Sequence, residues 1–247
     1  MNKFEYGCWN IISDPFIVRT LANELDFLFV DLEHGFRDFK DLTSALIATQ
    51  NANSDIYVRV RNYRDPWIQS LLDLGVTRFI IPQIRKVSEI EEFLQASTFP
   101  PAGRRGLHPR VYQSTPTGRN TLKDILISKI KVCVIIETKE SLELLEELCA
   151  NPQIDEIYLG VYDLSMELGI VNGTDSEEML AICAKISKTA ERFAKPLIAM
   201  ATNHSVLKKL SLIGVSKFVI GIDSSMLQES ARSTVRDFRD TLDSNLA

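Results

Sequence analysis

The 247-residue sequence lacks the features that mark several large classes of protein. It contains no glycine-rich phosphate-binding loop of the GxGxxG or GxxxxGKS/T type. No apolar run approaches the roughly 18 residues that cross a membrane, and the N-terminal segment lacks the long apolar core of a signal peptide. The net charge of −5 offers no basic face to nucleic acid. These absences predict a cytoplasmic protein that binds neither membranes nor nucleic acid.

Cysteine is scarce and unpaired in sequence. The four cysteines, at positions 8, 133, 149 and 183, form no CxxC motif, so a redox or structural-zinc site has no support. Cys133 and Cys149 lie inside apolar patterns. We therefore expect buried free thiols in a reducing compartment.

Short apolar runs alternate with amphipathic segments along the whole chain. Runs that are apolar on both faces are typical of parallel strands covered by helices. Eight such units in about 250 residues predict a (β/α)8 TIM barrel, with residues 1–247 as a single domain. An open, doubly wound sheet is the alternative, but it would usually carry a glycine-rich nucleotide loop. The predicted strands are Phe4–Ile12, Phe27–Asp31, Ile56–Arg61, Phe79–Pro82, Val132–Glu137, Ile157–Gly160, Pro196–Met200 and Phe218–Ile222.

Two neighbouring predicted strands each lead into a carboxylate. The fifth ends at Glu137, and the sixth passes through Gly160 and reaches Asp163. Because adjacent parallel strands lie about 4.8 Å apart, both carboxylates should project from one edge of the sheet. Two carboxylates with water oxygens suit Mg²⁺ or Mn²⁺, whereas zinc would want grouped His or Cys ligands. The alternative for Asp163 is an N-cap of a helix that begins near Leu164.

Further polar residues follow other predicted strands, where the active sites of TIM barrels lie. His34 could be the acid or base of a reaction, or a turn residue with a solvated ring. Arg59 could stabilise a developing negative charge, or pair with a carboxylate such as Glu33 and steady the barrel. The residues at these strand ends are Asp31, Glu33, His34, Arg59, Arg61 and Asp223.

One long irregular stretch, Thr98–Asn120, separates the fourth and fifth units. Loops of this length are usually functional or disordered. We expect it to lie over the catalytic mouth, where its arginines would suit an acidic substrate; a solvated lid without specific contacts is the alternative. The arginines are Arg104, Arg105, Arg110 and Arg119.

Six motifs together resemble one enzyme family. DLEHG, YVRV, LLDLG, FPPAGRRG, IIETKE and LGVYDLS occur in the order and spacing of the HpcH/HpaI aldolase family. The resemblance runs from about Trp9 to the GIDSS segment near residue 221, which is most of the chain. Members of that family are metal-dependent pyruvate aldolases built on a TIM barrel. The resemblance therefore implies the same fold, a Mg²⁺ or Mn²⁺ cofactor, and a keto acid and an aldehyde as small-molecule partners.

The resemblance also implies roles for particular residues. Glu137 and Asp163 would hold the metal. His34 would be the acid/base residue, oriented by Asp31 or by Asp73 of the LLDLG motif. The residues expected to contact the substrate are Arg59, through the keto oxygen, the backbone of Gly160, Val161 and Tyr162, through the carboxylate, and also Trp9 and Arg105.

The chain departs from the family pattern at two places beside these residues. Ile135 stands two residues before the metal glutamate, where the family usually has glutamine. The segment Gly160–Asp163 reads GVYD, where the family usually reads GPxD, so Tyr162 brings a bulky ring to the expected carboxylate loop. Both changes concern the substrate more than the reaction class.

The expected reaction is aldol cleavage of a 4-hydroxy-2-oxo acid to pyruvate and an aldehyde, or its reverse. One alternative is a related lyase that acts on an acyl-CoA ester, and another is a barrel that binds a keto acid without converting it. The final helix, from about Ser224, carries apolar residues amid charge. Together with the resemblance, this predicts a homo-oligomer, specifically a hexamer.

Overall fold

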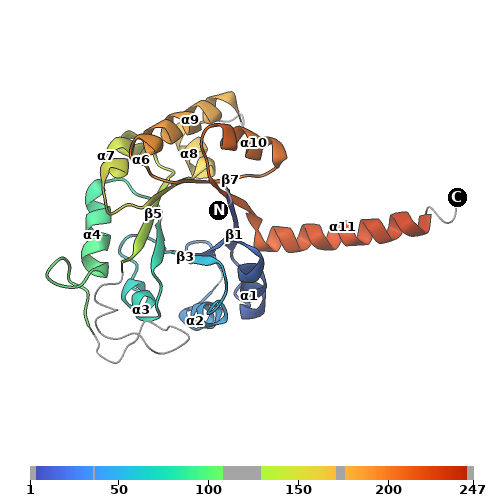
Figure 1. Ribbon diagram of the computed structural model, residues 1–247, viewed down its shortest axis with the longest axis horizontal. Helices are drawn as coiled ribbons and strands as arrows, with labels where there is room; N and C mark the ends of the chain where they lie inside the picture. Colours follow the sequence, from blue (N-terminus) through green and yellow to red (C-terminus); the bar gives the residue numbers. More distant parts are fainter. Residues whose placement is uncertain (1–3, 36, 108–128, 171–175, 244–247) are drawn as a thin grey trace.

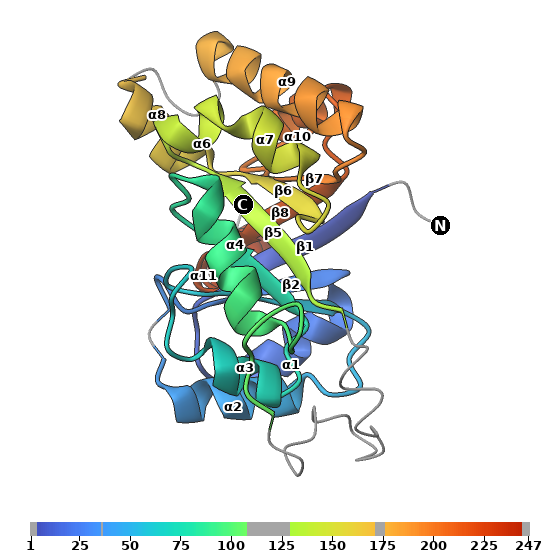
Figure 2. The same ribbon diagram turned by 90° about the vertical axis from the view of Figure 1, so that its left-hand side faces the viewer.

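The computed structural model describes residues 4–35, 37–107, 129–170 and 176–243. Eight parallel strands pair in sequence order and close into a barrel, because β8 pairs with β1. This confirms the predicted (β/α)8 fold, and Figures 1 and 2 show the helices around the strands. The strands are β1 (Glu5–Asn10), β2 (Phe27–Asp31), β3 (Asp55–Arg59), β4 (Arg78–Ile81), β5 (Lys131–Ile136), β6 (Glu156–Leu159), β7 (Leu197–Met200) and β8 (Lys217–Ile222).

Helices cover the outside of the barrel, and local sequence signals set their ends. α1 begins where the Asp14 carboxylate accepts hydrogen bonds from two backbone N–H groups, with Pro15 at its first position. Gly75 and Gly214 follow α3 and α10 in the left-handed conformation. The helices are α1 (Pro15–Glu24), α2 (Phe39–Ala48), α3 (Ile68–Asp73), α4 (Val87–Ser97), α6 (Lys139–Glu143), α7 (Leu145–Ala150), α8 (Val161–Leu168), α9 (Glu177–Arg192), α10 (His204–Leu212) and α11 (Asp223–Asp243).

The start of α8 differs from one of our alternatives. The helix begins at Val161, directly after β6, and Gly160 occupies the N-cap position without a side-chain hydrogen bond. Asp163 therefore lies inside the first turn of α8 and does not cap it. Its carboxylate is left available for contacts across the end of the barrel.

The interior of the barrel is a packed core of mainly aromatic and branched side chains. Residues that alternate along each strand point inward, as the period of two requires. Trp9, Phe29, Tyr57 and Tyr158 make edge-on ring contacts there, so the barrel is filled and is not a pore. All four cysteines are buried and free, as expected.

A buried ion cluster closes the N-terminal end of the barrel. The ammonium nitrogen of Lys217 lies 2.9 Å from a carboxylate oxygen of Glu156 and 2.9 Å from one of Glu5. It also donates a hydrogen bond of 3.2 Å to the Tyr57 hydroxyl. Burial lowers the pKa of Lys217, but the carboxylates outweigh burial and raise it, so the lysine stays charged. The open end is therefore the C-terminal one.

The segment after α4 corrects one expectation. Residues 98–107 follow a helix and lead toward β5, so they lie at the N-terminal end of the barrel and not over the catalytic mouth. Arg105 there forms an ion pair of 3.0 Å with Asp73 and lies over the Phe99 ring. Residues 108–120 of the predicted lid, with Arg110 and Arg119, lie outside the described residues.

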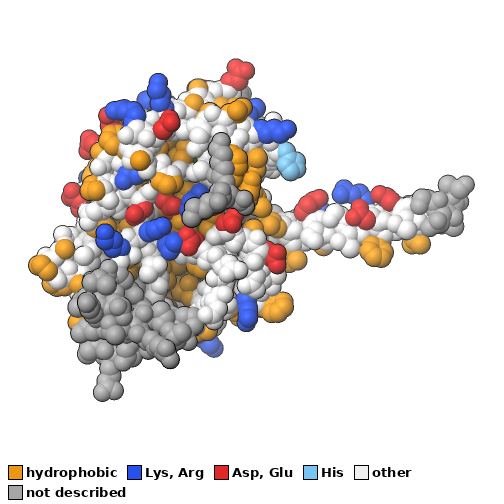
Figure 3. Space-filling model, in the orientation of Figure 1, with side chains coloured by type: hydrophobic (Ala, Val, Ile, Leu, Met, Phe, Trp, Pro, Cys, Tyr) orange, Lys and Arg blue, Asp and Glu red, His pale blue; other side chains and the backbone are white. Residues whose placement is uncertain are grey.

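The last helix, α11, extends away from the barrel (Figure 1). Its apolar side chains gather along one side, and charged side chains lie along the other (Figure 3). Leu227, Val235, Phe238 and Leu242 are all exposed, Phe238 to 73%. Within the described ranges, no helix combines the length and the apolar character that crossing a membrane requires.

Candidate active site

A cavity of about 420 Å³ opens at the C-terminal ends of the strands. Most of the residues that the sequence proposed as a site come together in its lining, from β1 through α8. These are Trp9, Asp31, His34, Arg59, Glu137, Gly160, Val161, Tyr162 and Asp163. The Glu137 and Asp163 carboxylates thus face the same space, as a shared cation requires.

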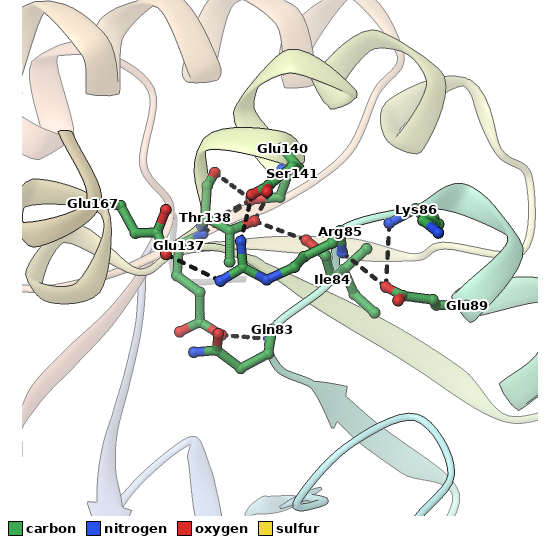
Figure 4. Close-up of polar contacts among 10 residues, drawn as sticks. All are labelled: Gln83, Ile84, Arg85, Lys86, Glu89, Glu137, Thr138, Glu140, Ser141 and Glu167. Atoms are coloured by element: carbon green, nitrogen blue, oxygen red, sulfur yellow. Dashed lines mark hydrogen bonds and ion pairs between the residues drawn. The ribbon is translucent and has the colours of Figure 1, made fainter.

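Glu137 directly follows β5 and is only 2% exposed. Its carboxylate accepts a hydrogen bond of 2.6 Å from the backbone N–H of Gln83, which adopts the left-handed conformation with φ of 56°. Close by, the Thr138 hydroxyl donates to the carbonyl of Ile84 at 2.8 Å. Figure 4 shows how these contacts join the loop after β4 to the loop after β5 and so fix the Glu137 side chain.

Arg85, on the loop after β4, contacts the helices that follow β5 and β6 at the surface. Its guanidinium forms ion pairs with Glu140 on α6, at 2.6 Å, and with Glu167 on α8, at 3.0 Å. Glu167 lies one helical turn after Asp163. Arg85 therefore ties the helix that carries Asp163 to the loops that hold Glu137 (Figure 4).

Gly160 leaves room for Glu137. A Cβ atom at Gly160 would lie 2.5 Å from the Cβ of Glu137 and 2.7 Å from a methyl group of Ile135. Real side chains essentially never approach so closely. Glycine at this position therefore lets α8 begin beside Glu137 without displacing it.

Burial and like charge raise the pKa of Glu137 to about 7. Burial is the larger cause, and the carboxylates of Glu33 and Asp163 add to it. The Gln83 N–H group and Arg59 act in the opposite direction without cancelling the rise. A buried carboxylate with a second carboxylate across the cavity is an environment that a cation would stabilise.

Arg59 ends β3 and is buried between two carboxylates. Its guanidinium donates to both oxygens of Asp31, with an Nε–Oδ1 distance of 2.8 Å, and lies 3.0 Å from an oxygen of Glu33. It also lies over the Trp9 ring, 4.2 Å from the centroid. Burial alone would lower the pKa of Arg59, but its carboxylate neighbours raise it, so the charge is fixed. Pairing with Glu33, one of our two sequence interpretations, is thus present.

His34 lies in a tight turn organised by Asp31. The Oδ1 atom of Asp31 accepts hydrogen bonds from the backbone N–H groups of Glu33, at 2.9 Å, and His34, at 3.3 Å. A Cβ atom at Gly35 would lie 2.0 Å from the Asp31 carbonyl oxygen, so the turn requires glycine there. The His34 ring is exposed at the cavity mouth. Asp31 therefore positions the backbone of the His34 turn.

Several predicted residues lie elsewhere. Asp73, on α3, accepts hydrogen bonds from the side chains of Gln69 and Arg105. Neither Asp73 nor Arg105 lines the cavity. Arg61 forms an ion pair with Asp65.

Asp223 is also used outside the cavity. It accepts hydrogen bonds from the Asn10 side chain and from the backbone N–H groups of Ile11 and Ile12. It therefore fastens the start of α11 to the end of β1 and takes no part in the cavity lining.

Sequence reasoning missed two kinds of site residue. Gln83 acts through its backbone N–H, so its side-chain identity carries no signal. The others are aromatic or aliphatic residues: Ile11, Tyr158, Leu159, Met200 and Ile222, together with Ile135, which was noted only as a departure from a motif. Ile135, Tyr158, Met200 and Ile222 belong to the cluster inside the barrel, whereas Leu159 belongs to the core between the strands and the helices.

The donor set fits a hard cation. In the described part of the chain, no group of three or more His, Cys, Asp or Glu side chains is arranged to hold a metal. Glu137 and Asp163 would therefore supply two oxygen ligands and leave the remaining positions to water or substrate, as magnesium sites commonly do.

Comparisons with known proteins agree with this fold. Residues 5–205 match the HpcH/HpaI aldolase/citrate lyase family. A hydroxypyruvate/pyruvate aldolase of Roseobacter denitrificans is 25% identical over 92% of this chain and 90% of its own length. A 4-hydroxy-2-oxo-heptane-1,7-dioate aldolase of Escherichia coli is 27% identical over 95% and 90%. The crystal structure of a protein of the same family from Burkholderia cenocepacia superposes with a TM-score of 0.85, at 22% identity over 96% and 95% of the two chains.

Proposed function

The chain belongs to the HpcH/HpaI aldolase/citrate lyase family, and we propose that it catalyses metal-dependent cleavage of a 4-hydroxy-2-oxo acid to pyruvate and an aldehyde, or the reverse addition. The observation that carries this proposal is the cavity in which Glu137 and Asp163 face Arg59 and His34. The named aldolases aligned over nine-tenths of their length support the reaction class.

We assign the binding roles as follows. Glu137 and Asp163 would hold Mg²⁺ or Mn²⁺, which supplies Lewis acidity toward the oxygens of the keto acid. The backbone N–H group of Gly160 already donates to the carbonyl of Ile136, at 3.1 Å. The N–H groups of Val161 and Tyr162, at the positive end of α8 and in the cavity lining, would therefore receive the substrate carboxylate. Arg59 places a fixed positive charge beside the keto oxygen.

The proton is moved by His34. In cleavage it takes the proton of the C4 hydroxyl while the C3–C4 bond breaks and C4 becomes the aldehyde carbonyl. The electron pair left on C3 spreads onto the keto oxygen, where Arg59 stabilises the negative charge. The proton that His34 took is then returned to C3, directly or through water, and completes the methyl group of pyruvate. Asp31 accepts hydrogen bonds from both the Arg59 guanidinium and the backbone N–H of His34. This one carboxylate therefore fixes the position of Arg59 relative to the turn that carries His34.

Two other functions remain as alternatives. A lyase for acyl-CoA esters would need a site for the nucleotide, and the sequence shows no motif for one. A barrel that only binds a keto acid would have no use for a base at the mouth. A turnover assay with pyruvate and a panel of aldehydes, with and without added Mg²⁺ or Mn²⁺, separates the aldolase from both alternatives. Absence of any metal-dependent aldol product would defeat the proposal.

Replacing His34 by alanine tests the proposed proton transfer. We expect turnover to fall by about 10²–10⁴-fold, the usual contribution of a general acid/base. Binding of Mn²⁺, followed by calorimetry, should change little, because the ligands are on other elements. His204, at the start of α10 and outside the cavity, provides a matched control in His204→Ala. A His34 variant with wild-type rates would show that another group moves the proton.

We also propose that the protein assembles through α11, as a hexamer. A helix with one apolar side in water gains stability mainly when that side is buried. Replacing Phe238 by aspartate should therefore lower the mass measured by light scattering at micromolar concentration. Arg236, on the opposite side of the helix because two residues turn it by about 200°, gives the control Arg236→Asp. A wild-type monomer under these conditions contradicts the proposal.

A further inference from the structure

The cavity is divided into two sides of different chemistry. Its charged and ionisable side chains come from β2, β3, β5, α8 and the loops that follow these strands. Another part of its wall comes from β7, β8 and β1, which are consecutive in the closed barrel. The residues of that part, which we call the apolar arc, are Trp9, Ile11, Met200 and Ile222.

The apolar arc offers no free polar group to a ligand. The indole N–H of Trp9 donates a hydrogen bond of 3.1 Å to the Tyr158 hydroxyl, so the one polar side-chain atom of the arc is already used. Ile135 and Tyr158 continue the apolar surface below it. The Arg59 guanidinium lies over the Trp9 ring, but a charged group placed against Ile11, Met200 or Ile222 would lose water without gaining a partner.

The charges on the other side also disfavour a second anion. Arg59 is the sole fixed positive charge among the described residues that line the cavity, and its guanidinium is held by Asp31 and Glu33. With Glu137 and Asp163, the carboxylates outnumber the positive charges even with a divalent cation bound. The keto acid itself adds one more carboxylate, so a further one would meet net repulsion.

We propose that the apolar arc holds the part of the substrate that becomes the aldehyde, and that the enzyme selects aldehydes with uncharged aliphatic chains over aldehydes that carry a carboxylate. The inference rests on the aldolase function proposed above. The pyruvate part occupies the charged side, because Arg59 and the two carboxylates are there. The C4 substituent then extends across the cavity toward Met200 and Ile222.

The test measures kcat/KM for aldol addition of pyruvate to four aldehydes in the presence of Mn²⁺. Ethanal, propanal and butanal form a series in which each added methylene should raise kcat/KM by about fourfold, the effect of burying one CH₂ group. Butanal and 4-oxobutanoate have the same number of carbons and differ in the terminal group. We expect kcat/KM to be at least tenfold higher for butanal. Equal or better use of 4-oxobutanoate overturns the inference.

One substitution should reverse this preference. Met200→Arg places a guanidinium on the apolar arc and should raise the ratio of 4-oxobutanoate to butanal turnover by at least tenfold. Met166 is 80% exposed on the outer side of α8 and does not line the cavity, so Met166→Arg makes the same chemical change elsewhere. That control should keep the wild-type ratio. An unchanged ratio in a folded Met200→Arg protein, judged by its thermal transition, would exclude the arc as the aldehyde site.

The outcomes separate the inference from the function on which it rests. If no aldehyde gives a product with pyruvate, the aldolase function fails. If products form and 4-oxobutanoate is preferred, the aldolase function stands and the selectivity inference is wrong. Should Met200→Arg fail to fold, the wild-type comparison of butanal with 4-oxobutanoate still decides the question.

Discussion

Replacing Glu137 by glutamine should abolish metal-dependent turnover and remove a pH dependence from the stability of the metal-free protein. Loss of a carboxylate ligand leaves Asp163 as the one proposed protein ligand, so little cation should remain bound at millimolar Mg²⁺. The effect on turnover should be the largest of any single substitution in the cavity. Glu143, exposed on α6, provides the matched control Glu143→Gln, which should behave like the wild type.

The expected pH dependence follows from the raised pKa of Glu137. The pKa is about 7 in the folded protein and 4.5 for an ordinary glutamate. Between these values the folded protein binds more protons than the unfolded chain, so its free energy of unfolding falls as the pH rises from about 4.5 to 7. Glu137→Gln removes this loss. In urea titrations with EDTA, the variant should be more stable than the wild type at pH 8 and equal to it at pH 4. Parallel profiles would show that the carboxyl is not perturbed.

The same group predicts how the metal competes with protons. A cation binds the ionised carboxylate, so at pH 6, one unit below the pKa of Glu137, about nine-tenths of the sites must release a proton first. Affinity for Mn²⁺ should therefore be about tenfold weaker at pH 6 than at pH 8. Calorimetry in buffers of different ionisation enthalpy would count the released proton.

Replacing Arg59 by lysine should reduce turnover by at least about tenfold and also lower the melting temperature. Catalysis suffers because a guanidinium fixed beside the keto oxygen becomes a mobile ammonium group at the point where negative charge develops. In the sequence, stabilising a negative charge and pairing with a carboxylate were alternatives for Arg59. Stability should suffer as well because Arg59 is buried and donates to both oxygens of Asp31 while contacting Glu33.

Arg61 provides the matched control for Arg59. It also forms a two-point ion pair, with Asp65, but it lies outside the cavity. Arg61→Lys should therefore leave kcat unchanged. If Arg59→Lys lowers the melting temperature and leaves turnover near normal, Arg59 serves only the scaffold. A fall in kcat larger than any change in KM would support its role in the transition state.

The fold was predictable because the pattern that indicates it is repeated eight times along the chain. Eight apolar runs of similar length gave the strands, and errors of one or two residues at the ends did not change their number or order. The location of Glu137 was predictable for the same reason, since a carboxylate directly after a buried strand has a fixed place in a parallel barrel. Residues 98–107 were placed at the wrong end because the preceding helix was not taken into account.

The finer geometry of the site was beyond the sequence. The contact between Gln83 and Glu137 uses a backbone N–H, which any residue but proline has. Asp223 and Asp163 are both acidic residues near strand ends, yet one is used to fasten α11 and the other faces the cavity. The two residues differ in the direction that the chain takes after the strand. That direction depends on packing between elements that are distant in the sequence.

The closure of the barrel by β8 has a consequence for the order of folding during synthesis. Asn10 and Asp223, which are hydrogen-bonded, are 213 residues apart in the chain. Until the last strand leaves the ribosome, β1 remains an open sheet edge, and Glu5 and Glu156 lack the cation that joins them. β8 supplies the missing strand, and Lys217, its first residue, supplies the positive charge between the two carboxylates. The nascent chain should therefore depend on protection from aggregation until almost the whole protein has been made.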